Sequence, residues 1–355
     1  MVRTVFEEGE GIGRVTEYAI FGEEELRIAV IGGGTGSFTL LGALKKKTPQ
    51  IAALVNMADD GGSTGQLRDE LGVLPPGDVR QCLVALSDSP ELRDLFTYRF
   101  SDGSFKGHAF GNLFLTACEK MTGSFAAGVQ IASEVLDITG SVEPITLSDV
   151  KLAMRDENGK ETRGEFRISH RKFDGRELQF WLEPEAEANP RALSAIQQAD
   201  IVVIAPGNLY GSLAPALIVP GIGRALMSTH ALCIYVCNLV TKPGQTDGYN
   251  VCDFANEIER LAGSKFLDAV LFNTEQPDRQ LLDKYAKDGE LAVEYVAPKR
   301  EPHYMLAGAQ LLSSRVWSGG TTSDPIAATR TLIRHDPEAV ADAILDIYRH
   351  GRQGA

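Results

Sequence analysis

The chain has 355 residues with a formal net charge of −13, and 36 of its residues are glycine. Its length corresponds to about two domains or one large one, and the glycine excess follows no collagen repeat. The acidic balance excludes a general nucleic-acid binder, which needs a clustered basic surface. Five scattered cysteines exclude a disulfide scaffold.

We expect residues 1–25 to form a flexible acidic N-terminal extension. This segment holds seven glutamates against two arginines and lacks the basic-then-apolar order of a signal peptide. No apolar stretch approaches 18 uninterrupted residues. We therefore expect a cytoplasmic protein without a membrane partner, in which residues 26–350 form a single α/β domain and residues 351–355 form a tail.

The first elements predict the opening of a parallel βαβ unit. The apolar run Leu26–Ile31 predicts a buried strand, a glycine loop follows it, and Ser37–Lys47 predicts a helix. A second buried strand is predicted at Ile51–Met57, followed by the loop Ala58–Gly65. Further helices are predicted at Val79–Leu86, Glu91–Tyr98, Gly111–Met121 and Phe125–Leu136.

The middle of the chain has a different sequence pattern, with strand-like alternation in place of alternating strands and helices. Strand-like alternation is found at Thr146–Arg155, Glu161–Ser169 and Glu177–Leu182, and turn residues separate these runs at Asp156–Lys160 and Phe173–Arg176. The pattern predicts a small antiparallel β insertion at about residues 142–183.

The alternation of strand and helix then resumes and predicts a doubly wound α/β sheet. Strands are predicted at Ile201–Ala205, Leu232–Cys237 and Asp268–Phe272. Helices are predicted at Arg191–Gln198, Leu213–Met227, Cys252–Ala262, Arg279–Lys287 and Pro337–Arg349. Ligands of such sheets bind beyond the carboxyl ends of the strands, so we expect the site in the loops that follow the strands.

The loop Gly32–Ser37 is the first candidate. Gly32 and Gly34 fit two positions of the G-x-G-x-x-G fingerprint, but Ser37 occupies the third, which makes NAD a poor candidate. Glycines at a helix N-terminus still expose N–H groups to a phosphate, and Thr35 and Ser37 offer hydroxyl donors. A tight turn without a ligand is the alternative; one glycine would suffice for it, so we favour phosphate binding.

Carboxylates mark the next two loops. Asp59 and Asp60 suit a sugar hydroxyl or a Mg²⁺ ion, although Asp-Asp-Gly-Gly alone is more often a solvated turn. Asp78 stands at a predicted helix start, where capping is the simplest role. A lone histidine is more often structural than catalytic, and His108 is a candidate site residue only because of the glycines around it. The later loops Gly207–Ser212 and Asn238–Tyr249 offer polar side chains and N–H groups for a second phosphate or a sugar.

These motifs together resemble the gluconeogenesis factor family, the YvcK-like branch of the CofD-like superfamily. The resemblance covers roughly residues 27–349. It is carried by Gly32–Gly36, Ala58–Gly65, Pro75–Leu83, Gly107-His108, Gly111–Leu113, Pro206–Tyr210, Thr246–Tyr249 and Arg334–Pro337. Two positions depart from the family pattern: Asn208 stands where Ser is more usual, and Gln245 stands where Glu is more usual, which removes one carboxylate from its loop.

The resemblance implies a Rossmann-like fold with a mostly parallel sheet and the binding of UDP-N-acetylglucosamine. It also implies a role in cell shape and envelope precursor supply on gluconeogenic carbon sources. The enzyme branch of the superfamily transfers a 2-phospholactyl group to a deazaflavin, in coenzyme F420 synthesis, and uses Mg²⁺. The positions that match the nucleotide and phosphate portions of both branches are Gly32–Gly36, Asp59, Asp60, Asp78 and Gly207–Ser212.

Three hypotheses follow. We favour a regulatory protein that binds a nucleotide sugar or another phosphorylated small molecule, with Arg334 as a phosphate clamp. The second is a Mg²⁺-dependent transferase in which Asp59, Asp60 and Asp78 hold the metal, and the third is a nicotinamide oxidoreductase, which the broken fingerprint disfavours. No other cofactor is expected, and a homo-oligomer is left open. The candidate ligand-binding residues are Gly33, Gly34, Thr35, Gly36, Ser37, Asp59, Asp60, Ser63, Asp78, Arg80, His108, Asn112, Gly207, Asn208, Tyr210, Ser212, Asn238, Thr241 and Arg334.

Overall fold

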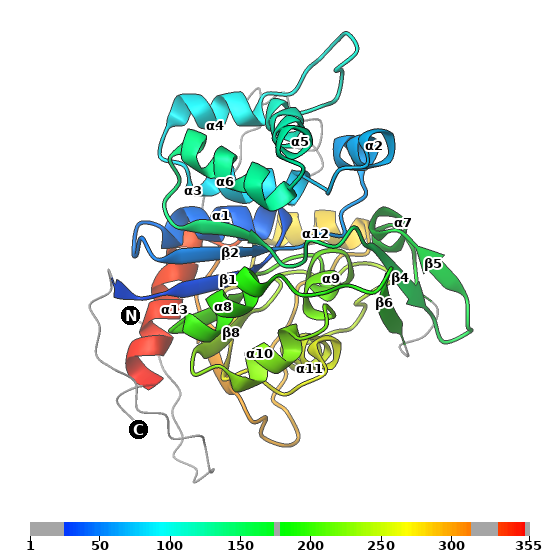
Figure 1. Ribbon diagram of the computed structural model, residues 1–355. Coiled ribbons are helices and arrows are strands. Elements are labelled where there is room, and N and C mark those ends of the chain that lie inside the picture. Colours follow the sequence, from blue (N-terminus) through cyan, green and yellow to red (C-terminus); the bar gives the residue numbers. More distant parts are fainter. Residues whose placement is uncertain (1–24, 174–177, 314–332, 352–355) are drawn as a thin grey trace.

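The computed structural model of the chain describes residues 25–173, 178–313 and 333–351 (Figure 1). Residues 1–24 of the expected N-terminal extension and residues 352–355 of the expected tail lie outside the described residues, as does most of the predicted turn at Phe173–Arg176.

A seven-stranded sheet forms the centre of the molecule. Its strand order is β10-β9-β8-β7-β1-β2-β3, and every neighbouring pair is parallel. This is the order of the doubly wound Rossmann fold with one further strand. The strands are β1 (Ile28–Gly32), β2 (Ile51–Val55), β3 (Ser141–Pro144), β7 (Ile201–Ile204), β8 (Leu232–Val236), β9 (Ala269–Asn273) and β10 (Met305–Ala309).

The central strands are apolar because both of their faces are covered. In β1 all five residues are buried, and Ile28 lies between Ile51 of β2 and Ile201 of β7 in the parallel register. Successive side chains point to opposite faces of the sheet, so Ala29 and Ile31 enter one core while Ile28 and Val30 enter the other. The continuous apolar runs in the sequence therefore correctly predict buried parallel strands.

Helices cover both faces of the sheet, as Figure 1 shows for the layers above and below it. One core is closed by α1 (Gly34–Leu44), α3 (Gly77–Leu86), α4 (Pro90–Thr97), α5 (Phe110–Thr122), α6 (Phe125–Leu136) and α13 (Pro337–Gly351). The other core is closed by α8 (Pro190–Gln198), α9 (Ala214–Leu217), α10 (Ile222–Ser228) and α11 (Val251–Ala262). Helix α12 (Arg279–Lys287) lies between β9 and β10 in the chain. The predicted doubly wound α/β fold with a mostly parallel sheet is confirmed.

The β insertion is present but begins later than expected. Its three strands, β4 (Lys151–Arg155), β5 (Glu161–Arg163) and β6 (Gln179–Glu183), form an antiparallel sheet in the order β5-β4-β6. Residues 142–144, assigned to the insertion from the sequence, instead belong to β3 and pair with β2 of the main sheet. The predicted strand Glu161–Ser169 is a strand only to Arg163, because Glu165–Ser169 forms the short helix α7.

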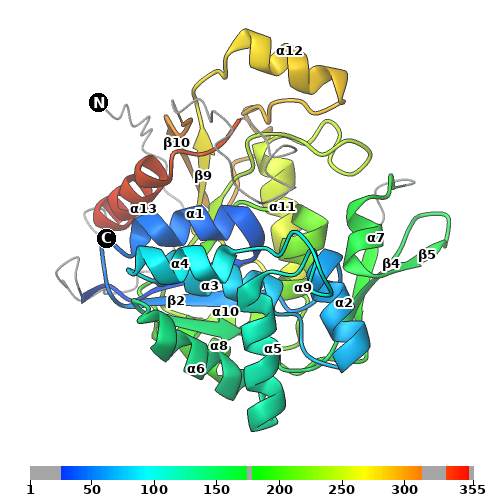
Figure 2. The ribbon, with the colours of Figure 1, turned by 90° about the horizontal axis from the view of Figure 1, so that it is seen from above.

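Two further elements form in segments for which the sequence predicts neither a helix nor a strand. Residues Gly62–Leu71 form helix α2, although the two glycines before Ser63 favour a loop, and β10 has no marked alternation in its sequence. The predicted helix Leu213–Met227 is a π-helical turn at Leu209–Leu213 (η2) followed by α9 and α10. In Figure 2, α2 and α7 lie beside one another at the same end of the molecule.

Among the described helices, none is by itself both long and apolar enough to cross a membrane. One bent pair, Leu209–Leu217 with Ile222–Ser228, meets that test only when its two helices are taken together.

Candidate functional site

The strand order reverses between β1 and β7, and the loops that follow these two strands are in contact. A Cβ atom added to Gly36 would lie 1.8 Å from the carbonyl oxygen of Pro206. Only glycine permits this approach, so the first glycine loop packs directly on the loop after β7. In an open α/β sheet this switch point is where ligands bind.

A cavity of about 350 Å³ opens at this switch point. It is lined by the loops that follow β1, β7 and β8 and by the segment that precedes α13. Its volume falls within the range of small-molecule pockets. Its lining includes Thr35, Gly36, Gly207, Asn208, Lys242, Gln245, Glu290, Arg334 and His335.

The N-terminus of α1 forms one wall of the cavity. Gly33 is the N-cap and offers no side chain to the first amides of the helix. Asp78 accepts a hydrogen bond from the N–H of Gly34, and Gly34 has a φ of 68°, which favours glycine. The first amides of a helix have no partner within it, and Thr35 and Gly36 carry such amides on the cavity wall. The arrangement suits an anion.

A carboxylate cluster lies beside this wall. Burial raises the pKa of Asp78 to about 8, and repulsion from Asp59 and Glu165 adds to the effect. Burial also raises the pKa of Asp59 and brings that of Glu165 to about 7, with a further contribution from Asp59 and Asp60. The sequence predicts the three aspartates but not Glu165, which α7 of the insertion supplies.

The three aspartates predicted to hold Mg²⁺ have separate hydrogen-bond partners. Asp59 accepts from the N–H of Gly61 at 3.0 Å, Asp60 accepts from the N–H of Phe166 at 2.8 Å, and Asp78 is bonded to Gly34. Within the described ranges, no three His, Cys, Asp or Glu side chains come close enough together to hold a metal ion. In this arrangement Asp59, Asp60 and Asp78 do not form a preformed metal site, and Mg²⁺ binding by them stays a prediction.

Four predicted residues form a chain of hydrogen bonds behind the cavity. Arg80 Nε donates to Asn112 Oδ1 at 2.9 Å, Asn112 Nδ2 donates to Ser63 Oγ at 3.2 Å, and Ser63 Oγ lies 2.9 Å from His108 Nδ1. The sequence lists these residues separately as ligand-binding candidates, and α2, α3, α5 and the loop before α5 bring them together. None of them lines the cavity.

Several other candidates support the loops. Asn238 Nδ2 donates to the carbonyl of Gly207 at 2.8 Å, which joins the loops after β7 and β8. Thr241 is buried, and its Oγ1 accepts from the N–H of Leu291. Ser37 is buried beneath the first loop, and Ser212 lies one turn beyond the cavity lining.

Tyr210 belongs to the core. It is fully buried, its ring stacks on Phe180 with 5.0 Å between centroids, and its hydroxyl lies 3.1 Å from that of Tyr249. The ring therefore attaches the β insertion to the main domain, and Tyr210 does not belong to the cavity lining.

Helix α7 is held against the site loops by polar contacts. Asn208 Nδ2 donates to Ser169 Oγ at 2.8 Å. Gln245 Nε2 donates to the carbonyls of Ile168 at 2.9 Å, Ser169 at 3.2 Å and Arg171 at 2.9 Å. The departure from the family pattern at residue 245 thus has a physical reason, because an amide can donate to these carbonyls and a carboxylate cannot.

Arg334 lines the cavity, as expected for a phosphate clamp. Its segment is fixed by two backbone hydrogen bonds, from Ser313 to the carbonyl of Arg334 at 2.9 Å and from Asp336 to the carbonyl of Leu311 at 2.8 Å. The neighbouring His335 donates to the carbonyl of Cys237, and burial lowers its pKa to about 4, so its ring is neutral at pH 7.

Three residues of the cavity lining carry buried acceptors without a partner: Asn208 Oδ1, Gln245 Oε1 and His335 Nε2. Buried polar atoms usually have a hydrogen-bond partner, and each one left without costs about 1–3 kcal/mol. This part of the lining therefore suits a ligand with hydrogen-bond donors.

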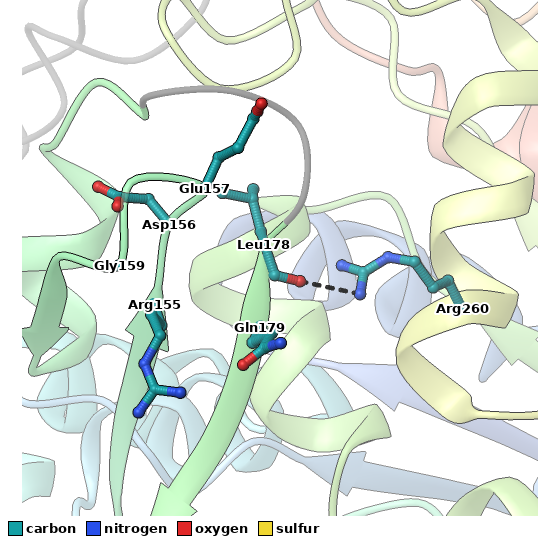
Figure 3. Close-up of a pocket in the computed structure, with 7 residues that line it drawn as sticks. All are labelled: Arg155, Asp156, Glu157, Gly159, Leu178, Gln179 and Arg260. Atoms are coloured by element: carbon teal, nitrogen blue, oxygen red, sulfur yellow. Dashed lines mark hydrogen bonds between the residues drawn. The ribbon is translucent and has the colours of Figure 1, made fainter.

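A second cavity, of about 450 Å³, lies between the β insertion and α11 (Figure 3). Figure 3 shows Arg260 pointing from α11 toward the carbonyl of Leu178, to which it donates at 3.0 Å. Arg155 is paired with Glu161 at 2.6 Å and Arg260 with Glu257 at 2.6 Å. Because these cations are paired and none of the loops that follow the strands of the seven-stranded sheet contributes the lining residues named in Figure 3, we do not assign the ligand site to this cavity.

Known proteins resemble the chain over most of its length. Residues 28–308 match the family model described as 2-phospho-L-lactate transferase CofD. A "Putative gluconeogenesis factor" of Thermotoga maritima is 40% identical over 91% of this chain and 100% of its own length. The "Gluconeogenesis factor" of Bacillus subtilis is 35% identical over 91% of this chain and 98% of its own.

A crystal structure from Bacillus halodurans, described as a member of the UPF0052 family, superposes with a TM-score of 0.80 at 35% identity. The match covers 91% of this chain and 100% of that one. The match to the family model and the identities over nearly the full length of the relatives agree with the resemblance seen in the motifs. The chain therefore belongs to the CofD family and, within it, to the group of the gluconeogenesis factors.

Proposed function

We propose that the chain is a cytoplasmic regulatory protein that binds UDP-N-acetylglucosamine and serves envelope precursor supply and cell shape on gluconeogenic carbon sources. The observation that carries the proposal is the cavity at the switch point of the sheet, which the loops after β1 and β7 form together. Gluconeogenesis factors are the relatives that match the whole fold.

The cavity lining offers two kinds of group to a ligand. The amides of Thr35 and Gly36 at the α1 N-terminus, together with Arg334, suit the pyrophosphate. The unpartnered acceptors of Asn208 and Gln245 suit the hydroxyl groups and amide N–H of the amino sugar. A nucleotide sugar carries both kinds of group in one molecule.

Calorimetric titration with UDP-N-acetylglucosamine tests the proposal. We expect saturable binding that Arg334→Ala weakens about tenfold or more, because a charge-assisted hydrogen bond is lost. Thr35→Ala should weaken it about threefold to tenfold through one lost hydroxyl contact. Arg224→Ala, on an exposed position of α10, is the matched control. If the chain binds no uridine nucleotide, the proposal is wrong.

A second candidate function is transfer of a phosphorus-containing group, favoured by the CofD family model and by the carboxylates with raised pKa values. Turnover of a deazaflavin acceptor with a nucleotide-activated 2-phospholactyl donor, measured with and without Mg²⁺, separates it from the first. Metal-dependent product that Asp78→Asn abolishes would favour the transferase. Ligand binding without product under all conditions would favour the regulatory protein.

A further inference from the structure

Lys242 places an ammonium group at the cavity, and among the described residues it has no partner in an ion pair. The side chain is half-buried and lines the cavity. Its backbone is fixed, because its N–H donates to Thr246 Oγ1 at 2.7 Å and its carbonyl accepts from Gln245 at 3.0 Å and from Thr246 at 2.9 Å. In the part of the chain that the structure describes, no carboxylate lies within ion-pair distance of its Nζ.

The nearest carboxylates act on Lys242 only from a distance. Glu165 of α7 and Glu290 on the cavity wall favour the charged form of the lysine, whereas burial opposes it and lowers its pKa. Removing a cation from water is costly unless an opposite charge or hydrogen bonds compensate. A cation held in this way at a cavity wall is therefore suited to an anion that enters the cavity.

The rest of the lining indicates where that anion lies. The amides of Thr35 and Gly36 and the side chain of Arg334 line the same cavity and also favour negative charge. Lys242 comes from a different loop, the one after β8, so cations reach the cavity from two separate segments. A diphosphate carries two charged groups and can contact both.

We propose that Lys242 binds the diphosphate of the ligand, as a second cationic contact beside Arg334. The proposal rests on the proposed function and names a residue that distinguishes a diphosphate from a single phosphate. Glu165 and Glu290 limit the negative charge that the cavity accepts. The diphosphate is therefore held at Lys242 and α1, and the uncharged part of the ligand faces the rest of the lining.

Titration calorimetry on the full chain tests this assignment with three probes: UDP-N-acetylglucosamine, inorganic pyrophosphate and UMP. We expect Lys242→Gln to weaken the first two about tenfold to a hundredfold, the loss of one charge-assisted contact, and UMP less than threefold. Lys242→Arg keeps the charge and should stay within about threefold of the wild type. Lys265→Gln, at an exposed lysine between α11 and β9, is the control, and far-ultraviolet circular dichroism verifies folding.

The outcomes separate this inference from the proposed function. If UDP-N-acetylglucosamine binds and Lys242→Gln leaves its affinity within twofold, the assignment of Lys242 is wrong and the proposed function stands. If only pyrophosphate binds, and binds less tightly to Lys242→Gln, the assignment stands and the proposed ligand is wrong. If neither UDP-N-acetylglucosamine nor pyrophosphate binds the wild-type chain, the assignment of Lys242 and the proposed function are both wrong.

Discussion

The exchange of Gln245 for Glu is the change whose consequence follows most directly from the structure. The Gln245 side chain is 8% exposed, and its amide nitrogen lies 2.9–3.2 Å from three carbonyl oxygens at the end of α7. Three acceptors around one end of the amide fix its orientation. Gln245→Glu places a carboxylate oxygen where the two N–H groups stood, and the three carbonyls lose this donor, although that of Ile168 still accepts from the N–H of Arg171.

The magnitude can be worked out from these contacts. Two N–H groups are lost, and each buried acceptor left without a donor costs about 1–3 kcal/mol. We expect the free energy of unfolding to fall by about 2–4 kcal/mol at neutral pH. With about 2.1 cal/mol/K of unfolding entropy per residue, a domain of this size loses about 1.5 °C in Tm per kcal/mol. The melting temperature should therefore fall by about 3–6 °C.

The pH dependence gives the sharper test. In the Gln245→Glu variant the introduced carboxyl faces three carbonyls and is stabilised in its protonated form. Its pKa in the folded state is therefore raised above the unfolded value of about 4.3. The folded variant then binds more protons than the unfolded chain, and stability is lost as pH rises from the unfolded pKa through the folded one.

Differential scanning calorimetry between pH 4 and pH 8 measures this slope. Gln245→Met removes the donor without adding a charge, and its difference from the wild type should not change with pH. The reasoning is wrong if Gln245→Glu melts with the wild type at pH 8, or if its difference from the wild type is the same at both ends of the range.

Three further predictions concern the site and its support. Binding of UDP-N-acetylglucosamine should weaken as pH rises through 7, because Glu165, with a pKa of about 7, becomes negative there; Glu165→Gln should flatten this step in calorimetric titrations, and an unchanged step would contradict the assignment. Gly36→Ala should reduce ligand affinity at least tenfold, since the added Cβ would lie 1.8 Å from the carbonyl oxygen of Pro206; calorimetry that gives wild-type affinity would show that the two loops separate freely. Tyr210→Phe removes the hydroxyl contact with Tyr249 and should cost about 1 kcal/mol in denaturant unfolding, while ligand affinity stays within twofold.

The central fold could be predicted because its signals are local. Buried parallel strands read as short apolar runs, and the glycine loop after β1 follows such a run directly. The members of the hydrogen-bond chain from Arg80 to His108 could be singled out as candidates from short polar motifs, but their contact with one another could not be predicted, because Ser63 stands in the unpredicted helix α2.

The rest of the site depends on long-range contacts. Glu165 comes from an insertion about a hundred residues after the first acidic loop, and the alternation in Glu161–Ser169 favours a strand that would place it elsewhere. Helix α7 forms there because it rests on Gln245 and Asn208, and tertiary contacts of this kind override a local pattern. Lys242 and Gln245 lie in a loop whose length and polarity suggested function. Only the folded chain shows that both residues line the cavity and that Gln245 also holds the insertion.

The charge of the protein bears on the choice of ligand. An acidic chain repels anions at long range, so an anionic ligand must be held by short-range contacts. The N-terminus of α1, Arg334 and Lys242 supply these contacts in the cavity lining. Glu290 and the unpartnered acceptors of Asn208 and Gln245 also line the cavity, and Glu165 acts on Lys242 from outside the lining. A ligand that is negatively charged throughout is repelled by Glu290 and Glu165, and an uncharged sugar offers the cations no opposite charge. The arrangement therefore favours a molecule with a diphosphate at one end and hydrogen-bond donors at the other, which is the chemistry of a nucleotide sugar.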